Sequence, residues 1–200
     1  ALLIAWNIRG QFANIFLAFH HALFQVGSVI TTTGFSTVDF DLWPSFAKWI
    51  LVTLMFMGAC AGSTGGGLKV SRVVIAFKTA SREIQSLIHP RSIKVLKFEG
   101  KTVDQSIIKS LGAYLAGYFV IFFVSVLIVS LDNMDLETNF TAIAATFNNI
   151  GPGLAKAGPT CNFAFFSPLS KFVMMFDMLA GRLELFPMLV LFSPRTWRKE

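Results

Sequence analysis

One uncharged, predominantly apolar run constrains the fold of this chain more than any other feature. Residues 110–131 (SLGAYLAGYFVIFFVSVLIVSL) contain no Asp, Glu, Lys or Arg over 22 positions. A helix of that length is about 33 Å long, which matches a hydrocarbon core of roughly 30 Å. Charged residues make up 14% of the whole sequence, whereas soluble domains carry about 25%. The sequence therefore predicts an all-α integral membrane protein.

The other apolar segments are shorter or interrupted. Residues 168–192 are long enough for a second crossing, although they contain four charged side chains. Residues 43–57 would form a helix of only about 22 Å. They run into GACAGSTGGG at 58–67 and resume as LKVSRVVIAFKTASREIQSLI, which predicts a transmembrane helix broken at membrane depth. Residues 11–30 and 136–148 are also short, and they end in TTTGFST and NNIGPGL.

The placement of basic residues predicts the topology, because Lys and Arg accumulate on the cytoplasmic side of membrane proteins. Nine of the 17 basic residues lie between 69 and 109, and three more lie near the C-terminus. Both regions are therefore expected to be cytoplasmic. The segments that face outward would then carry Asp39, Asp41, Asp132, Asp135 and Glu137. With crossings at 110–131 and 168–192, the segment ending in NNIGPGL must enter and leave on the outer side as a re-entrant loop.

The sequence also contains an internal repeat. An offset of 117 residues places TTTGFST on NNIGPGL and Gly34 on Gly151. Each copy follows a short apolar helix and precedes a polar loop and a helix that begins near Pro44 or Pro168. The predicted fold is two helix–pore loop–helix units with re-entrant half-helices and one broken transmembrane helix.

These units divide the chain into three parts. We expect the first unit at residues 1–88, with its first helix truncated, and the second unit at residues 110–200. A basic cytoplasmic linker is expected between them at 89–109. Because the sequence begins without Met, in what resembles the tail of a helix, it is expected to be a piece of a longer protein.

Backbone exposed at membrane depth indicates an ion-binding function. Irregular backbone is tolerated inside a bilayer only where it is buried in protein or lines a water-filled path. Potassium channels bind desolvated cations with rings of backbone carbonyls, and a glycine with positive φ lets a carbonyl point toward the pore axis. The half-helix before the loop directs the negative end of its dipole at the cavity beneath, and outer acidic residues would raise the local cation concentration. We therefore expect the carbonyl groups of residues 31–34 to coordinate a cation.

Four motifs occur in an order that resembles a known family: TTTGFST, MGACAGSTGGGLKVSRV, NNIGPGL and MLAGRLELFP. They are similar to the C-terminal half of the Trk/Ktr/HKT superfamily of potassium transporters, and most closely to its bacterial Trk branch. The resemblance covers nearly the whole chain. It implies a pore formed by four helix–pore loop–helix repeats in one chain, of which these two would be the third and fourth.

The resemblance assigns roles to individual residues. It implies a potassium filter formed by two segments, Thr31, Thr32, Thr33 and Gly34 in the first loop and Asn148, Asn149, Ile150 and Gly151 in the second. It also implies an intramembrane gate below the filter, formed by Ala59, Cys60, Ala61, Gly62, Ser63, Thr64, Gly65, Gly66, Gly67 and Arg182. In the closed state Arg182 would face the conduction path, repel cations and pair with carbonyl groups of the loop.

Simpler interpretations of the gate residues stay open at this point. The glycine-rich stretch is not a P-loop, because Leu68 and Lys69 follow Gly67 and no strand precedes it. It could nevertheless be a structural kink that packs against neighbouring helices. Arg182 could extend its guanidinium to the inner headgroups. Asp177 and Glu184 lie on other faces of the same predicted helix, so we do not expect either to neutralise Arg182 directly.

The resemblance also implies the surroundings of the protein. The expected substrate is the potassium ion, and the expected location is the bacterial inner membrane, in which the protein would be a multi-pass homodimer. The expected partner is a cytoplasmic nucleotide-binding regulatory subunit, a ring of Rossmann-type domains. The basic residues of 72–101 are expected to contact membrane lipid headgroups. They share no soluble face, so the net charge of +6 does not indicate nucleic acid.

Other function classes receive less support. No Ser–His–Asp or paired-carboxylate arrangement survives the predicted topology, so we do not expect an enzyme, a cofactor or a transition-metal site. The alternative is an ion-coupled secondary transporter with its substrate site at the broken helix. In that case Ser63 and Thr64 would have to supply polar ligands at the break.

Overall fold

A computed structural model describes residues 1–58, 60, 62–63, 65–89, 96–98, 100–183, 185–191 and 194–197. The protein is mostly helical, as predicted, with one two-stranded antiparallel sheet. The first unit contains α1 (Leu2–Ile8), α2 (Ile15–Ile30), α3 (Ser45–Phe56) and α4 (Val70–Ile88). The second contains α5 (Gln105–Val129), α6 (Leu136–Phe147), α7 (Pro168–Leu183) and α8 (Leu185–Leu191). Short 3-10 helices are Arg9–Gln11, Phe40–Leu42, Ser130–Asp132, Ala155–Ala157 and Pro194–Trp197.

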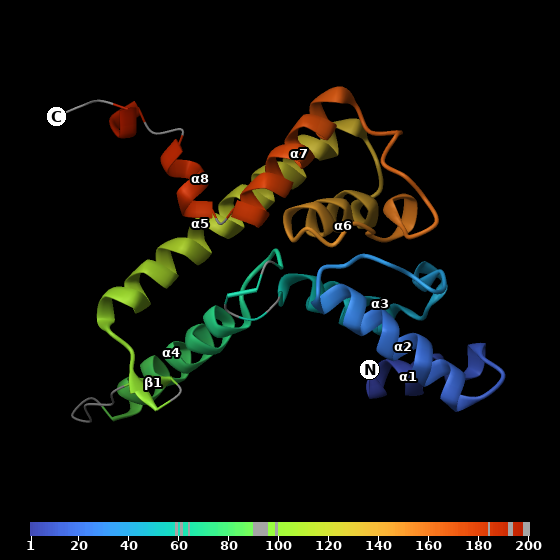
Figure 1. Cartoon of the computed structure of the whole chain (residues 1–200), viewed down its shortest axis with the longest axis horizontal. Coiled ribbons are helices and arrows are strands. Elements are labelled where there is room, and N and C mark those ends of the chain that lie inside the picture. The colour runs from blue at the N-terminus through green and yellow to red at the C-terminus, as the bar shows by residue number, and fades with distance from the viewer. Residues whose placement is uncertain are drawn as a thin grey trace.

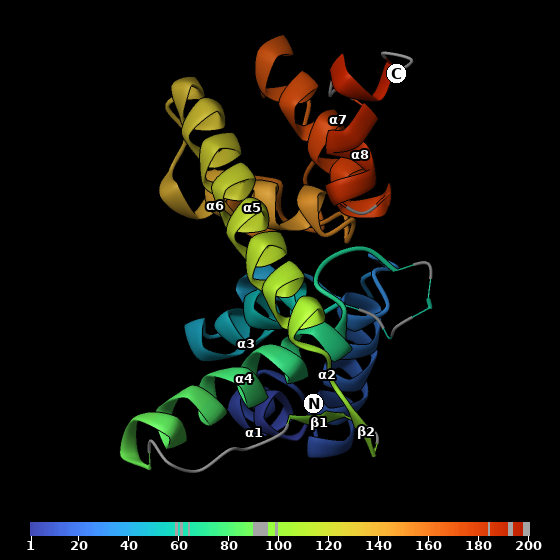
Figure 2. The ribbon, with the colours of Figure 1, turned by 90° about the vertical axis from the view of Figure 1, so that its left-hand side faces the viewer.

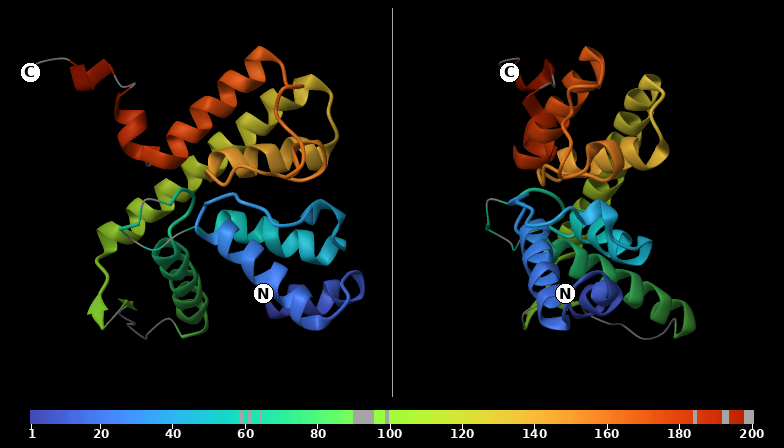
Figure 3. Two further views of the ribbon diagram at one scale, coloured as in Figure 1. Left: turned by 45° about the vertical axis from the view of Figure 1, so that its right-hand side comes forward. Right: turned by 90° about the vertical axis from the view of Figure 1, so that its right-hand side faces the viewer.

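The short helices of the two units lie against each other, and the long helices α4 and α5 extend away from that contact. Figure 1 shows α1, α2 and α3 on one side of the molecule and α6 and α7 on the other. In Figure 2, α5 runs from the second unit toward α4 and the small sheet. Helix α6 lies over the first unit and contacts α3 directly (Figure 3). This arrangement brings the C-terminal ends of the short helices α2 and α6 to the centre of the molecule.

Side chains just before the helices explain where several of them begin. Asn14 accepts a hydrogen bond from the Leu17 N–H (2.8 Å) at the start of α2. Asp135 accepts one from the Thr138 N–H (2.9 Å) at the start of α6. Both are N-cap residues, which satisfy backbone donors that the first turn of a helix leaves unpaired.

Aromatic side chains fill the core between α5, α6 and α3. Phe122 of α5 is 1% exposed, and its ring centroid lies 5.3 Å from those of Phe56 and Phe140, in edge-on geometry. The ring of Tyr118 packs against Phe147, with centroids 4.7 Å apart. Aromatic pairs at these separations stabilise a core beyond their buried area. They connect the long helix to the end of α6.

The predicted membrane crossing at 110–131 is confirmed as a helix, with an earlier start. The helical segment Gln105–Asp132 is long and apolar enough to cross a membrane. It begins five residues before the predicted run, since Gln105 and the polar residues after it continue the same helix. The predicted linker at 89–109 is correspondingly shorter, and its residues 90–95 and 99 lie outside the described residues.

The expectation of one continuous helix over 168–192 is wrong. Helix α7 ends at Leu183 and α8 begins at Leu185, with a change of direction that Figure 1 shows clearly. Pro187 supplies a physical reason, because a proline lacks the N–H that would bond to the carbonyl of Leu183 and its ring clashes with that carbonyl. The helix therefore breaks one turn before the proline.

The stretch expected to be a basic linker contains a hairpin. Strand β1 (Lys97–Phe98) pairs antiparallel with β2 (Lys101–Thr102), so that Lys97 lies opposite Thr102. Gly100 adopts a φ of +79° in the turn between them. Glycine reaches this left-handed conformation at no steric cost, which suits a tight hairpin turn.

Candidate ion-conducting site

Helices α2 and α6 end in the same way. The N–H of Thr33 donates to the carbonyl of Ser28 (2.9 Å), and the N–H of Thr32 donates to the carbonyl of Val29 (3.1 Å). At the end of α6, Ile150 donates to Ala145 (2.8 Å) and Asn149 to Thr146 (3.0 Å). Each pair forms a Schellman motif, in which the last helical carbonyls are satisfied by the residues that follow. The two motifs are 117 residues apart, which is the offset of the sequence repeat.

The segments that follow share an unusual backbone conformation. Thr32 and Gly34 have φ values of +54° and +78°, and Asn149 and Gly151 have +57° and +110°. Positive φ therefore occurs at every second residue in both loops. A β-branched residue such as Thr32 rarely adopts this conformation, and strained residues of this kind cluster at functional sites. The alternation rotates successive peptide planes, so that carbonyl groups can point to one side.

The carbonyl groups of these segments are available to a ligand. In the described structure, the carbonyl oxygens of residues 31–34 and 148–151 accept no hydrogen bond. Two of the three hydroxyl groups at positions 31–33 are already engaged: Thr31 Oγ1 donates to the Gly27 carbonyl (2.7 Å) and lies 2.7 Å from Thr33 Oγ1. The arrangement therefore offers main-chain oxygens in preference to side-chain oxygens.

The two segments meet at Gly34. A methyl group on Gly34 would overlap the carbonyl oxygen of Ile150 and would lie 3.3 Å from Cδ of Pro152. Only a residue without a side chain allows the two backbones to approach this closely. The structure thus brings the two segments that the resemblance assigns to the filter into contact at Gly34 and Ile150.

Three hydrogen bonds between the segments and residues outside them, or just beyond their ends, hold the segments in place. Ser28 Oγ donates to the carbonyl of Phe35 (2.6 Å), just after the first segment. Tyr118 Oη of α5 donates to Asn148 Oδ1 (2.7 Å). Asn149 Nδ2 donates to the carbonyl of Met178 in α7 (3.0 Å). The second segment is therefore held by two neighbouring helices.

The glycine-rich stretch between α3 and α4 forms a loop that closes at its base. The N–H of Gly58 donates to the carbonyl of Leu68 (2.9 Å), and Met57 and Leu68 form an isolated β-bridge. Lys69 Nζ donates to the carbonyl of Ser63 (2.6 Å) across the loop. Of the residues predicted to form the gate, Ala59, Ala61 and Thr64 lie outside the described residues.

The end of this loop lies against the second filter segment. A methyl group on Gly66 would lie 2.6 Å from the carbonyl oxygen of Asn148 and 2.9 Å from Cβ of Asn149. A methyl group on Gly67, whose φ is +76°, would lie 2.7 Å from Oδ1 of Asn148. The loop therefore contacts Asn148 through glycines, where larger residues do not fit.

Arg182 does not pair with the described carbonyl groups of the glycine-rich loop, the contact that the resemblance implies. Its side chain is exposed on α7, and its guanidinium forms no hydrogen bond or ion pair within the described part of the chain, which includes six of the nine predicted loop residues. The preceding residue, Gly181, packs against the end of α6. Consecutive helical residues point in directions about 100° apart, so Arg182 points away from that contact.

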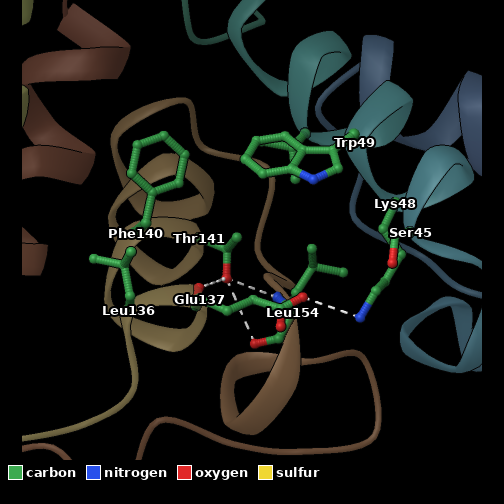
Figure 4. A pocket seen from close by; sticks show the side chains of 9 residues that line it. Ser45, Lys48, Trp49, Leu136, Glu137, Phe140, Thr141 and Leu154 are labelled. Atoms are coloured by element: carbon green, nitrogen blue, oxygen red, sulfur yellow. Dashed lines mark hydrogen bonds and ion pairs between the residues drawn. The ribbon is translucent and has the colours of Figure 1, made fainter.

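Acidic residues that were expected to face outward have structural partners. Lys48 Nζ of α3 lies 3.3 Å from Asp41 Oδ1 and 3.0 Å from Glu137 Oε1 of α6. Asp41 also accepts a hydrogen bond from the N–H of Ala155 (3.0 Å). Figure 4 shows Lys48 and Glu137 at the edge of a cavity of about 530 Å³ between α3 and α6. These carboxylates join the two units, a role that the sequence did not reveal.

Sequence reasoning also missed Tyr118 and Gly181. Tyr118 lies within the uncharged run of α5, where an aromatic residue gives no sign of a specific partner. Gly181 lies in the motif MLAGRLELFP, in which only the neighbouring arginine attracted a functional interpretation. A glycine inside a predicted helix costs about 1 kcal/mol relative to alanine, and that cost was the available signal.

Comparison with known proteins gives a consistent result. The family model described as TrkH, a cation transport protein, matches residues 14–199. The chain is 36% identical over 197 residues to the Trk system potassium uptake protein TrkH of Escherichia coli K12, covering 98% of this chain and 40% of that protein. It is 39% identical over 181 residues to the Vibrio parahaemolyticus protein of the same name, covering 90% of this chain and 37% of that one.

A solved structure agrees with these sequence matches. The crystal structure of the potassium transporter TrkH from Vibrio parahaemolyticus superimposes with a TM-score of 0.87 at 36% identity. The match covers 98% of this chain and 42% of that one. This chain therefore spans about two fifths of the length of the curated relatives it matches.

Proposed function

This chain belongs to the TrkH family of cation transport proteins, and we propose that it contributes two of the pore segments of a potassium-selective uptake channel or transporter. The observation that carries the proposal is the repeated backbone of the two loops. Residues 31–34 and 148–151 have the same helix-terminal hydrogen bonds, positive φ at equivalent positions, and carbonyl oxygens that accept no hydrogen bond.

Selection of potassium would depend on these main-chain oxygens. A ring of carbonyl dipoles can replace the hydration shell of the ion. Two adjacent segments supply part of such a ring, and family relatives that are more than twice as long provide room for further segments. The scarcity of hydroxyl groups in the second segment is compatible with this role, because the proposed ligands belong to the backbone.

The glycine-rich loop would control the flow of ions beneath the filter. Its contact with Asn148 supports a position next to the conduction path. Glycines at 65–67 give the backbone the freedom that a moving segment needs. Arg182, one residue after the helix contact at Gly181, would add a positive charge near the same path.

The full protein would act in the bacterial inner membrane with other components. We propose a homodimer in contact with membrane lipids, bound on the cytoplasmic side to a nucleotide-binding ring of Rossmann-type domains. The relatives are named as proteins of a Trk system, which supports the existence of a partner. The 69–109 region and the C-terminus would be cytoplasmic.

A secondary transporter with its substrate site at the broken helix receives less support. Such a site would require several polar ligands converging at the break. In the described part of the loop, the carbonyl of Ser63 is engaged by Lys69. The contacts made by the loop are those of a backbone packed against the filter.

Flux measurements on the full-length protein in liposomes test the proposal. Wild type should take up potassium and rubidium in preference to sodium. Gly34→Ser should lower that preference, because the new side chain overlaps Ile150. Arg182→Ala should raise the flux. If wild type transports no potassium, or if neither substitution changes flux or selectivity, the proposed filter and gate are wrong.

A further inference from the structure

Asn148 contacts the loop of the proposed gate with both its main chain and its side chain. Its carbonyl oxygen faces Gly66, and its side-chain Oδ1 faces Gly67. Asn148 is also the first residue of the second filter segment, and it is completely buried. Movement of the loop away from the filter would therefore remove contacts from a residue whose carbonyl is a proposed ligand.

Two side-chain hydrogen bonds would keep Asn148 in position after such a movement. Asn148 Nδ2 donates to the carbonyl of Ala144 (2.8 Å), one turn earlier in α6. Asn148 Oδ1 accepts from Tyr118 Oη (2.7 Å), which belongs to α5. The first bond lies within the same helix and moves with it. The bond to Tyr118 connects the filter to a separate, long helix.

Tyr118 is well suited to hold a fixed position. Its side chain is 2% exposed, and its ring packs between Phe147 and Phe119, with centroids 4.7 Å and 5.5 Å away. A buried aromatic ring in close contact with another helix has little freedom to rotate. Its hydroxyl is therefore presented to Asn148 in a defined direction.

Among the residues that the structure describes, no other helix holds the first filter segment in an equivalent way. Thr31, which corresponds to Asn148 at the repeat offset, bonds to Gly27 of its own helix and to Thr33 of its own loop. Gly66 and Gly67 lie against the second segment. The second filter segment, which contacts the glycine-rich loop, is thus also the segment that α5 holds through Tyr118.

We propose that Tyr118 is a positioning residue for ion selectivity, whose hydroxyl holds Asn148 so that the filter keeps its geometry while the glycine-rich loop moves. This inference rests on the proposed potassium function. It adds a residue outside the filter and the gate, and it predicts a dependence of selectivity on a single hydroxyl group of α5.

Removal of that hydroxyl tests the inference in the full-length protein. Tyr118→Phe keeps the packed ring and leaves Oδ1 of Asn148 without its donor. The potassium-to-sodium permeability ratio in liposomes should fall roughly fivefold, the factor expected from one neutral hydrogen bond. Tyr114→Phe is the matched control. It removes the same hydroxyl group from a tyrosine one helical turn earlier in α5, whose ring lies beneath the guanidinium of Arg72. It should leave the ratio unchanged.

A second variant acts at the other end of the same bond. Asn148→Leu keeps a similar volume but cannot accept from Tyr118, so it should also lower the ratio, and adding Tyr118→Phe should lower it little further. This double-mutant comparison separates a positioning role from general destabilisation, which would add in the double variant.

The outcomes distinguish the inference from the function on which it rests. If wild type does not transport potassium, the proposed function fails. If wild type is selective and both Tyr118→Phe and Asn148→Leu keep its permeability ratio, the function stands and the role of Tyr118 is overturned. If Tyr118→Phe does not fold, a wild-type ratio in Asn148→Leu alone also overturns it.

Discussion

Gly181 of α7 lies so close to Phe147 of α6 that a methyl group on its Cα would overlap the Phe147 carbonyl oxygen and lie 2.9 Å from Nδ2 of Asn149. The contact brings the last turn of α7 against the end of α6, where the second filter segment begins. The hydrogen bond from Asn149 to Met178 joins the same two helices. The helix that carries Arg182 is therefore in direct contact with the proposed filter.

We expect Gly181→Ala to separate α7 from the end of α6. Overpacking of this kind costs about 1–3 kcal/mol, and displacement of Asn149 should reduce potassium selectivity. Thermal unfolding in detergent and ion flux in liposomes would measure the two effects. The control is Gly112→Ala, at an exposed site on α5 where a methyl group meets no atom within 4 Å. Equal stability of the two variants would contradict the close contact.

Gly66→Ala should weaken closure of the gate. The added methyl group would lie 2.6 Å from the Asn148 carbonyl oxygen, so the loop would have to move away from the filter. Basal potassium flux should therefore rise. Gly10→Ala adds a methyl group at an exposed position outside the loop, where it meets no atom within 4 Å, and should leave the flux unchanged. A wild-type flux in Gly66→Ala would argue that the loop is a structural turn.

Thr32→Val tests whether the filter ligands belong to the backbone. Valine has a similar shape, is β-branched like threonine and lacks the hydroxyl group, so the backbone strain at a φ of +54° is nearly unchanged. The potassium-to-sodium permeability ratio should stay at its wild-type value. A large decrease would instead identify the Thr32 hydroxyl as a ligand.

Lys48→Met should weaken the contact between the two units. The substitution removes the ion pairs to Asp41 and Glu137 and leaves both carboxylates without this cation. We expect a loss of about 1 kcal/mol, because these groups remain partly exposed to solvent. Arg82→Gln, which removes an exposed pair to the adjacent Glu83, should have a smaller effect on the midpoint of thermal unfolding.

Asp135 should stabilise α6 in a pH-dependent manner. Burial opposes ionisation of its carboxyl group, but hydrogen bonds from Thr138 outweigh this and hold its pKa below the ordinary value. A lowered pKa contributes stability that is present above the unfolded pKa of about 3.9 and is lost as pH falls through the folded pKa. Asp135→Asn keeps an N-cap without charge, so wild type should exceed it in stability at pH 7. The difference should disappear at a pH well below 3.9, and a constant difference would exclude this role.

Local patterns in the sequence were sufficient to predict the class of protein, a helical membrane protein, and its internal repeat. The uncharged run at 110–131 indicated a crossing helix because helix length and hydrocarbon thickness are directly related. The offset between Gly34 and Gly151 indicated two equivalent loops, and their backbones do adopt positive φ at equivalent positions. These features depend on residues close together in the chain, where propensity and spacing act directly. The change of direction between α7 and α8 was missed because the effect of Pro187 was not weighed against the hydrophobic pattern.

The tertiary structure alone decided which segments meet. Gly34 with Ile150, Gly66 with Asn148, and Tyr118 with Asn148 are contacts between residues far apart in the chain. Their partners depend on the path of the backbone, which no local pattern encodes. The sequence by itself determined a helical membrane protein with two equivalent glycine-containing loops. Close packing of the helices then determined that α5 and α7 support the second loop. Two buried backbones can approach each other this closely only at a glycine. The polar groups buried in such a contact must also find hydrogen-bond partners.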